Sequence, residues 1–519
     1  MYRRTRFDSN KATNPTSLPQ LYFVLGEELP VALQGVTTPA KLALLGFEGK
    51  VGQVLFLAEA QTLLLGGQIP ASFNDTDRAH GLDFFALGAL AANTLSSFRL
   101  RQICVPSLPA GWTRERGSRL ETDLTDFLLG WLQGGVQNKA YKAKDSNPAP
   151  EITLSLSSAL HQQLSSRTSS RLDALDAGLT LTRELVDLTP AELHPGSVPT
   201  YLDAVFGDTS RVSLEYLDAA RLEDLGAGGI LAVGRASRYP SVLSKVTLDP
   251  TGTVERTVCL VGKGVTYDSG GLDIKTGGHM HTMKCDMAGA ATMAGVVRVL
   301  TDLELQRTRV VWFTGWVENM VSGAAYKADD ILTTLSGQTV EVWNTDAEGR
   351  LTLADALSLA TLEDPDYIVD AATLTGACVL ALSEHYTALM GNSQALLQDL
   401  EAAFVENHER VQTLPLPEVL REQIQGELGD LRNTGKERMA GHLTAGLFLS
   451  HFVEQAKFRP SVQDKFSVGT PKAYAWAHLD IAGSSFNSGK NPLGVNGATG
   501  ATVRSLVGWL EQVDTPKSS

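Results

Sequence analysis

The sequence is poor in cysteine and contains no apolar run long enough to cross a membrane. Only four of its 519 residues are cysteines, and these lie far apart: Cys104, Cys259, Cys285 and Cys378. This spacing indicates reduced, buried thiols rather than a disulfide framework. The N-terminus is basic but has neither an apolar stretch nor a cleavage site, so no secretory signal is expected. We therefore expect a cytoplasmic protein that does not enter a membrane.

Positive charge is also scarce. The 44 lysines and arginines are outnumbered by 58 aspartates and glutamates, which gives a formal net charge of −14. Nucleic-acid phosphates are bound by basic surfaces, so this balance argues against nucleic acid as the main partner. Hydrophobic residues make up 43% of the chain and charged residues 20%, as in ordinary globular proteins. A chain of this length is expected to form two or three domains.

Short strand-like and helix-like segments alternate along most of the chain, which predicts an α/β fold. Residues 1–20 are expected to be a flexible tail, and residues 21–190 a small N-terminal α/β domain that ends in a linker helix. This long helix covers 166–188, and Thr189-Pro190 should end it. Residues 191–519 are expected to form a larger domain, in which helices flank a mostly parallel central sheet.

The individual elements are predicted from short β-branched or aromatic runs and from helical spacing of apolar residues. In the larger domain the expected strands are 230–233, 258–261, 310–313, 339–343, 367–369 and 473–479, and expected helices include 289–302 and 352–360. In the smaller domain the expected strands are 21–25, 51–58, 102–106 and 152–156, and the expected helices are 81–98 and 123–133, the second with an aspartate cap.

Two stretches place acidic and basic residues among glycines just where a buried strand should end. They are residues 258–291 and 342–351. Ligand sites of open α/β sheets lie at the carboxyl ends of the strands, beside such turns. We therefore expect the chemistry of the protein in these two stretches.

Four carboxylates in these stretches could surround one or two divalent cations. Asp268 directly follows the first strand, and Asp286 precedes a run of small residues suited to the start of a closely packed helix. Asp346 and Glu348 lie two residues apart and would project on the same side of an extended chain. Oxygen ligands suit Mg, Mn or Zn. The alternative, that each acid merely caps a helix or a turn, is weakened by the basic residues interleaved with the acids.

Both stretches resemble conserved blocks of the leucyl aminopeptidase family, the two-metal cytosolic aminopeptidases called M17, which include the aminopeptidase A and B types. The matching blocks are VGKGVTYDSGG at 261–271, MKCDMAGAA at 283–291, NTDAEGRL at 344–351, DAATLTGAC at 370–378, WAHLDIAG at 476–483 and GATGATVR at 497–504. The resemblance extends from about residue 185 to the end of the chain, whereas the segment before it carries no such motif.

The resemblance implies a ligand set for two divalent metal ions per subunit, either Zn or Mn, with Mg or Co as alternatives. Asp268 and Glu348 would bridge the two ions. Lys263, as a neutral amine, and Asp286 would complete the tighter site, and Asp346 the more exchangeable one. Asp273 falls where the family has a non-ligand. His279 and His281, which also lie between the blocks, are expected to be loop residues.

Two basic residues would be catalytic by the same resemblance. A metal-bridging hydroxide would attack the scissile carbonyl, and Lys275 would stabilise the oxyanion. Arg350 would hold a bicarbonate ion that acts as the general base. The substrate would be contacted by these and further residues: Lys275, Met283, Asp286, Thr373, Leu374 and Gly376.

The function that the resemblance implies is a two-metal aminopeptidase, with residues 191–519 as its catalytic domain. It would remove N-terminal residues, leucine-like and others, from peptides with a free N-terminus, and would act as a homohexamer. Two alternatives keep the fold without this activity: a DNA-binding or regulatory protein, and a structural hexamer. The acidic balance weighs against the first, and the complete set of ligand and catalytic positions weighs against the second. Without the resemblance, metal-dependent phosphate hydrolysis would be a rival, because carboxylate clusters serve both reactions.

Overall fold

The structure is a computed structural model that describes residues 5–7, 20–24, 37, 41–42, 54–57, 62–66, 82–95, 102–105, 107, 120–134, 152–454, 474–488 and 497–516. Within these residues no helix combines the length and the apolar character needed to cross a membrane. The chain divides into two compact units. One comprises Met1–Asp176 and Asn487–Thr499, and the other Ala177–Phe486 and Gly500–Ser519. The domain limits expected at residues 20 and 190 stay a prediction.

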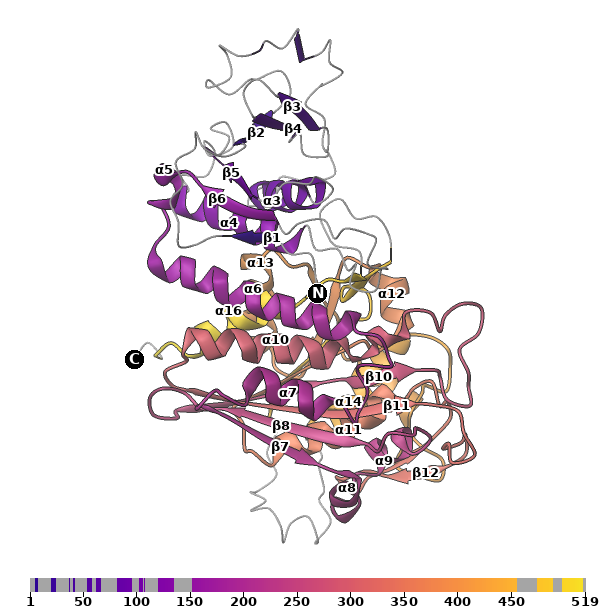
Figure 1. Cartoon of the computed structure of the whole chain (residues 1–519). Helices are drawn as coiled ribbons and strands as arrows, with labels where there is room; N and C mark the ends of the chain where they lie inside the picture. The colour runs from indigo at the N-terminus through magenta and orange to yellow at the C-terminus, as the bar shows by residue number, and fades with distance from the viewer. Residues whose placement is uncertain are drawn as a thin grey trace. The chain divides into compact units, whose positions relative to one another are not determined.

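The N-terminal unit contains a six-stranded sheet, and its described residues include the helices α3 (Leu82–Leu95) and α4 (Leu120–Gln133) (Figure 1). The strand order is β1 (Thr5–Phe7), β6 (Ile152–Leu156), β5 (Gln102–Val105), β2 (Gln20–Val24), β4 (Thr62–Gly66) and β3 (Val54–Leu57). All neighbours are parallel except β3 and β4. The pairing of β1 with β6 places part of the expected tail in the sheet.

Two helices of this unit pack with their backbones close together. They are α3 (Leu82–Leu95) and α4 (Leu120–Gln133). A Cβ atom on Gly88 would lie 1.9 Å from the carbonyl oxygen of Phe127, so only glycine permits this approach. The predicted aspartate cap of the second helix is wrong, because α4 begins before Asp123, which lies in its first turn.

The larger unit is built on a nine-stranded sheet. Its order is β16 (Val411–Thr413), β15 (Thr387–Gly391), β18 (Ala475–Asp480), β14 (Tyr367–Ala372), β9 (Arg256–Gly262), β11 (Thr308–Asn319), β8 (Val242–Leu248) and β7 (Val212–Leu217), with β10 (Gly264–Asp268) also paired to β11. The central strands β18, β14, β9 and β11 are parallel to one another. Antiparallel pairs occur only toward the edges of this sheet, in the part of the chain that the structure describes. The predicted α/β fold with a mostly parallel sheet is therefore confirmed.

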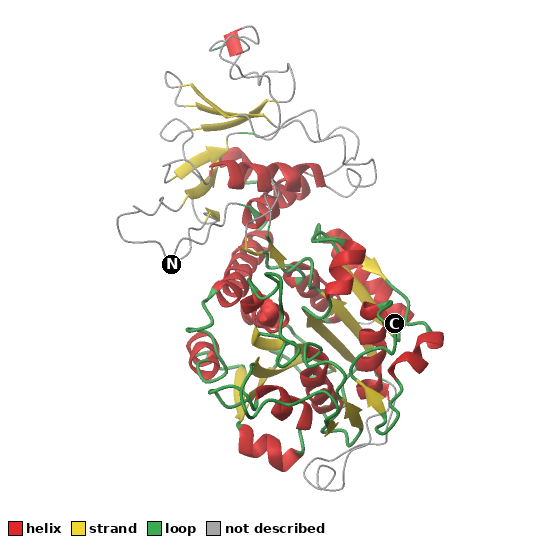
Figure 2. Ribbon diagram, turned by 90° about the vertical axis from the view of Figure 1, so that its right-hand side faces the viewer, coloured by secondary structure: helices red, strands yellow, loops and turns green. Residues whose placement is uncertain are grey.

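Helices lie on both sides of this sheet (Figure 2). On one side α10 (Ala288–Leu303) packs with α16 (Val503–Val513). On the other side α9 (Gly228–Gly234), α11 (Gly349–Thr361) and α14 (Gly441–Glu454) share an apolar core with the sheet. The central strands are mostly apolar, as expected for strands buried on both faces, although β14 and β18 also bury Asp370 and His478.

The described residues form further elements, of which α6 (Ser166–Asp187) is the longest. The other helices are α5 (Ser158–His161), α6 (Ser166–Asp187), α7 (Val198–Phe206), α8 (Ala219–Leu225), α12 (Gly376–Leu382) and α13 (Gln394–Glu406), with 3₁₀ turns η5 (Met283–Met287) and η6 (Glu418–Ile424). Two small sheets consist of β12 (Ile331–Thr333), β13 (Thr339–Glu341) and β17 (Leu431–Arg432), and of β19 (Phe486–Asn487) and β20 (Gly497–Ala498).

Two predicted strands of the larger unit need correction. Residues 230–233 form helix α9 instead, since a four-residue apolar run cannot by itself separate a strand from a buried helix. The side chain of Asp355 accepts a hydrogen bond from the Ile230 amide at 2.9 Å, which satisfies the start of this helix. The strand predicted at 339–343 ends at Glu341 and belongs to a separate three-stranded sheet.

Small residues allow α10 to start directly against the ends of two central strands. A Cβ atom on Gly289 would lie 2.0 Å from the carbonyl oxygen of Ala371 and 2.9 Å from the amide nitrogen of Lys263. A Cβ atom on Gly262 would lie 2.6 Å from the Cα atom of Ala290. This close packing holds the turn before α10 beside the strand ends, where the predicted site residues lie.

Candidate metal centre

The predicted site residues lie at the carboxyl ends of parallel strands. Lys263 follows β9, and Asp268 is the last residue of β10. Asp286 lies in η5, which leads into α10. Asp346 lies in a turn and Glu348 is the N-cap of α11, in a helical conformation. The chain is therefore not extended between these two acids, as the sequence had suggested, although both side chains reach the same place.

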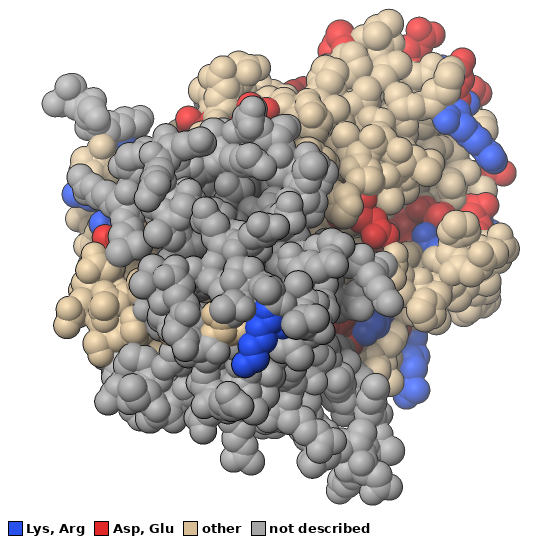
Figure 3. All heavy atoms as spheres, turned by 90° about the horizontal axis from the view of Figure 1, so that it is seen from above, with Lys and Arg blue, Asp and Glu red and all other residues tan. Residues whose placement is uncertain are grey.

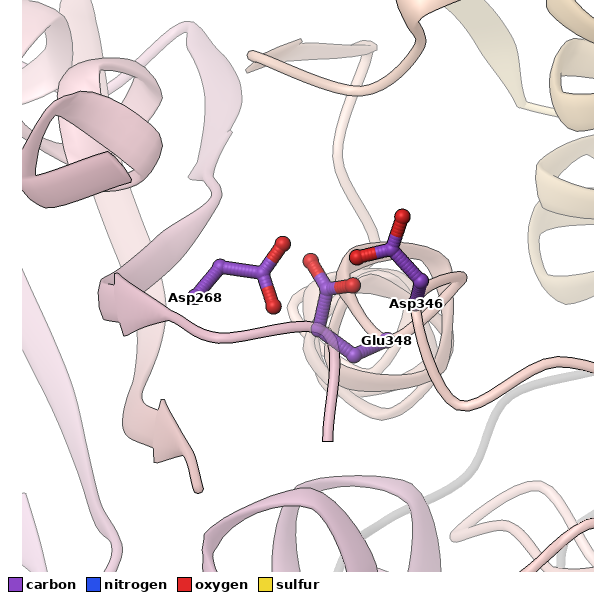
Figure 4. A group of neighbouring side chains, drawn as sticks. All are labelled: Asp268, Asp346 and Glu348. Atoms are coloured by element: carbon purple, nitrogen blue, oxygen red, sulfur yellow. The ribbon is translucent and has the colours of Figure 1, made fainter. Parts of the chain in front are cut away.

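Three of the carboxylates converge. One oxygen each of Asp268, Asp346 and Glu348 lies within 4.8 Å of the other two. Figure 4 shows the three carboxylates turned toward one another, from the end of a strand and from the segment that enters a helix. Asp268 is 2% exposed and Glu348 is 1% exposed, whereas Asp346 is half-buried. Such a cluster of oxygen ligands suits a divalent cation.

Two lysines lie between the carboxylates. The Lys263 ammonium nitrogen is 2.6 Å from Asp286 Oδ1 and 2.8 Å from Glu348 Oε1. The Lys275 ammonium nitrogen is 2.8 Å from Asp268 Oδ2 and 2.6 Å from Asp346 Oδ1. The structure thus brings together all five predicted metal ligands and the predicted catalytic lysine.

Burial and mutual charge shift the pKa values of these groups. Burial, together with Glu348, raises the pKa of Asp268 to about 6, and burial raises the pKa of Asp286 above its ordinary range. Burial would also raise the pKa of Glu348, but Lys263 and Lys275 outweigh it and lower this pKa. Burial opposes the charge of both lysines, yet the surrounding carboxylates raise the pKa of each. A divalent cation would therefore have to displace a proton from any lysine that it binds.

One ligand atom is buried without a partner. Asp286 Oδ1 accepts hydrogen bonds from Lys263 at 2.6 Å and from the Thr373 hydroxyl at 2.9 Å. Asp286 Oδ2 has no hydrogen-bond partner among the residues that the structure describes. Because an unpaired buried carboxylate oxygen is costly, this atom points to a group that binds there. A metal ion or a substrate amine fits such a position.

The loop that carries Lys275 is braced against the loop that carries Asp346. The Asp273 amide donates to the Thr345 hydroxyl at 2.8 Å, and the Thr345 amide donates to Asp273 Oδ2 at 2.7 Å. The Thr345 hydroxyl donates in turn to the carbonyl oxygen of Gly270 at 2.7 Å. Sequence reasoning set Asp273 aside as a non-ligand and missed this bracing contact, which joins residues far apart in the chain.

We expect Asp273→Ala to lower kcat by about 10- to 100-fold, because small misplacements of catalytic groups are that costly. The variant should keep its metal content, since Asp273 contacts no predicted ligand through its side chain. Steady-state kinetics together with metal analysis checks this, with the exposed Asp224 on α8 replaced by alanine as a matched control. An unchanged kcat in Asp273→Ala would show that the brace is dispensable.

Two further residues form hydrogen bonds to the loops that carry the predicted ligands. The sequence did not suggest either of them. Asn319, the last residue of β11, donates from Nδ2 to Asp268 Oδ1 at 2.8 Å and to the Thr345 carbonyl at 3.0 Å. The hydroxyl of the buried Tyr326 donates to the same carbonyl at 2.6 Å. A polar residue at the end of a parallel strand would have indicated Asn319 as a site residue, but the strand predicted here stopped at residue 313.

Arg350 is a buried cation at the start of α11. Its side chain is 7% exposed, and Nε has no hydrogen-bond partner among the described residues. Burial lowers the pKa of Arg350 to about 10, although Glu348 and Asp480 act in the opposite direction. The neighbouring Gly349 leaves room for the Lys263 side chain, because a Cβ atom there would lie 2.2 Å from Cε of Lys263 and would displace it. An unpaired guanidinium at a helix N-terminus fits a small anion.

Of the predicted substrate residues, Thr373 contacts Asp286 directly, with its hydroxyl 2.9 Å from Asp286 Oδ1. The Thr373 carbonyl accepts from Lys263 at 2.9 Å, and the Leu374 amide donates to Asp480 Oδ1 at 3.2 Å. Met283 begins η5 and is half-buried, and Gly376 is exposed with open space where a Cβ atom would lie. His279 and His281 are exposed residues outside the carboxylate cluster.

Comparisons with known proteins agree with one another. The model of the cytosol aminopeptidase family, catalytic domain, matches residues 180–507. A probable cytosol aminopeptidase of Rhodopirellula baltica is 35% identical over 466 residues, which cover 89% of this chain and 84% of the relative. One of Wolinella succinogenes is 34% identical over 501 residues, which cover 95% of each chain. The crystal structure of the cytosol aminopeptidase of Coxiella burnetii, at 29% identity, covers 97% of this chain and 99% of that one with a TM-score of 0.77. The protein is therefore a peptidase that belongs to the cytosol aminopeptidase family.

Proposed function

We propose that the protein removes N-terminal residues, leucine-like and others, from peptides with the help of two divalent ions, Zn or Mn. The observation that carries this proposal is the convergence of three carboxylates beside the Lys263–Asp286 pair. Family membership supports peptide hydrolysis, and the oxygen-rich cluster supports a metal-dependent reaction.

The ions would be held by the residues that converge at the strand ends. Asp268 and Glu348 lie centrally, so they would be shared by both ions, Lys263 and Asp286 would complete one site, and Asp346 the other. Bound divalent ions would lower the pKa of a water molecule and polarise the scissile carbonyl. Lys263 would have to lose its ammonium proton to act as a ligand, in exchange for the positive charge of the cation.

Lys275 would stabilise charge that develops on the carbonyl oxygen. It is half-buried, and its ammonium reaches both Asp268 and Asp346. Its two carboxylate partners raise its pKa, so that it stays protonated at neutral pH. A charged donor held beside the reacting carbonyl acts mainly in the transition state.

Arg350 would hold a bicarbonate ion, which would act as a general base. Its buried guanidinium, with Nε unpaired among the described residues, and its position at a helix N-terminus support this role. Substrate would be contacted by Lys275, Asp286 and the residues Met283, Thr373, Leu374 and Gly376. Asp286 Oδ2 would receive the free amine of the peptide.

Lys275→Ala should lower kcat by about 10²- to 10³-fold, the typical cost of losing one transition-state donor. Metal content should not change, because Lys275 is a donor and not a ligand. Kinetics with a leucyl anilide and metal analysis of the same sample check this, with the exposed Lys327 replaced by alanine as the control. Loss of metal from Lys275→Ala would instead make this lysine a ligand.

The active assembly is proposed to be a cytoplasmic homohexamer with inward-facing active sites, with no role in nucleic-acid binding. On the one face that Figure 3 shows, the described lysines and arginines are scattered, in line with the net charge of −14. Sedimentation should give six times the mass of one chain. A monomeric mass at micromolar concentration, in a sample that still hydrolyses substrate, would refute this assembly.

A further inference from the structure

A histidine and an aspartate form a buried pair beneath α11 that the proposed function does not use. Asp370 of β14 and His478 of β18 are neighbours in register, and both are fully buried. His478 Nδ1 lies 2.5 Å from Asp370 Oδ1, and Trp476 Nε1 donates to Asp370 Oδ2 at 2.8 Å. Both oxygens of Asp370 are therefore engaged, and Nδ1 of His478 is the nitrogen that carries a fixed proton.

The other nitrogen of this histidine is buried without a partner. His478 Nε2 forms no hydrogen bond with any residue that the structure describes. Because Nδ1 donates to Asp370, Nε2 is the nitrogen that gains or loses the exchangeable proton. A buried ring nitrogen without a partner is costly, so a small polar group is expected to lie against it.

Arg350 lies on the same side of the sheet. Trp476 of β18 belongs to the apolar core that α11 and α14 cover, and so do Ile368 and Ala372 of β14. Side chains alternate along a strand, so His478 and Asp370 also face this side. Arg350, in the first turn of α11, also has a buried nitrogen without a hydrogen-bond partner among the described residues, Nε.

The charged groups around His478 are few. Asp370 and Asp480 raise its pKa and Arg350 lowers it, while burial, the largest influence, also lowers it; the net effect is a raised pKa. Met390 of β15, opposite His478 in register, carries no charge, whereas α14 contributes the titratable His442, whose pKa is lowered by burial against the opposing effect of Asp480. Arg350 follows Gly349, whose backbone packs against the Lys263 side chain, and the Lys263 amide donates to the carbonyl of Ala371, the residue after Asp370 on β14. Asp480 is engaged elsewhere, by the Leu374 amide and the Thr375 hydroxyl.

We propose that His478 is a positioning residue of the Arg350 anion site, where its Nε2 hydrogen-bonds the bicarbonate ion that Arg350 holds and Asp370 fixes the orientation of the ring. This inference rests on the proposed role of Arg350. Nε2 donates to a bicarbonate oxygen when the ring is protonated and accepts from the bicarbonate hydroxyl when the ring is neutral. His478 therefore makes the affinity of the site for bicarbonate depend on pH.

Binding of ¹³C-labelled bicarbonate, followed by NMR line width across a range of pH, tests this on the full-length protein independently of catalysis. In His478→Asn the amide can replace the Nδ1 donor to Asp370 but leaves nothing at Nε2. The dissociation constant of His478→Asn for bicarbonate should rise by about 10- to 100-fold, the effect of losing one charge-assisted hydrogen bond. In His478→Gln the amide can occupy the Nε2 position, so binding should be largely kept while its pH dependence is lost.

Trp476→Phe is the matched control, because it removes the other partner of Asp370 and leaves His478 in place. The dissociation constant of this variant for bicarbonate should stay within about threefold of wild type, well below the effect of one charge-assisted hydrogen bond.

Arg350→Ala should abolish the binding of bicarbonate. If Arg350→Ala binds bicarbonate as the wild type does, or the wild type does not bind it, the proposed anion site fails and this inference with it. If only Arg350→Ala loses binding and a folded His478→Asn binds normally, the inference alone is overturned. Should His478→Asn fail to fold, an unchanged pH dependence in His478→Gln would overturn it.

Discussion

Glu348→Gln and Asp268→Asn are each expected to lower kcat/KM by about 10³-fold or more. Each amide keeps the volume of the side chain but removes a central negative charge that both ions are proposed to share. The stabilisation of the transition state by the metal ions is worth several kcal/mol, and each 1.4 kcal/mol that is lost lowers the rate by about a factor of ten. Metal analysis should show at most one ion per chain where the wild type holds two.

The reason for so large an effect lies in the lysines. Lys263 lies 2.8 Å from Glu348, and Lys275 lies 2.8 Å from Asp268. Each carboxylate offsets the positive charge of a lysine as well as that of a cation, so its loss leaves excess positive charge at the site and weakens the binding of divalent cations. Glu255→Gln, at an exposed surface pair with Arg307, is the matched control. If Glu348→Gln or Asp268→Asn kept two bound ions and near-wild-type turnover, the carboxylate replaced in that variant would not be shared by the two ions.

The position of the candidate site at the strand ends could be predicted because its signals are local. Gly262, Gly270 and Gly349 stand where a side chain would strike a neighbour or where the backbone has positive φ, and the acids and lysines alternate with such glycines. Short apolar runs before these glycines mark strand ends, and strand ends of a parallel sheet meet at one edge. The same logic predicted the helix that starts at the small residues after Asp286.

The parts that could not be predicted depend on contacts between distant segments. The brace between Asp273 and Thr345 joins two loops, and Tyr326 reaches the Thr345 carbonyl from a third. Helix α9 was mistaken for a strand because its apolar run is short and its start is satisfied by Asp355, 125 residues away in sequence. The pairing of Asp370 with His478 depends on strand order, which the sequence of either strand does not specify.

N-acetylation of the substrate is the second change expected to have a very large effect. Asp286 Oδ2 is buried and unpaired among the described residues, next to the Lys263 ammonium and the Thr373 hydroxyl that engage Oδ1. A free amine can fill that position with at least two N–H groups and a basic nitrogen, whereas an acetylated nitrogen brings extra atoms, has a single N–H and is no longer basic. Sites built to hydrogen-bond a substrate group reject analogues that lack it by about 10⁴- to 10⁵-fold, so we expect a loss of at least about 10³-fold in kcat/KM.

The measurement that tests the proposed aminopeptidase activity most directly compares two matched substrates, leucyl anilide and N-acetyl-leucyl anilide. Both are followed with the wild-type protein, supplied in turn with Mn and with Zn, from about pH 6 to 10, the range over which a substrate amine and metal-activated water lose protons. The account predicts hydrolysis of the free substrate that rises from acidic toward mildly alkaline pH, and almost none of the acetylated one. Comparable hydrolysis of the two substrates would contradict it and identify the protein as an endopeptidase or an amidase.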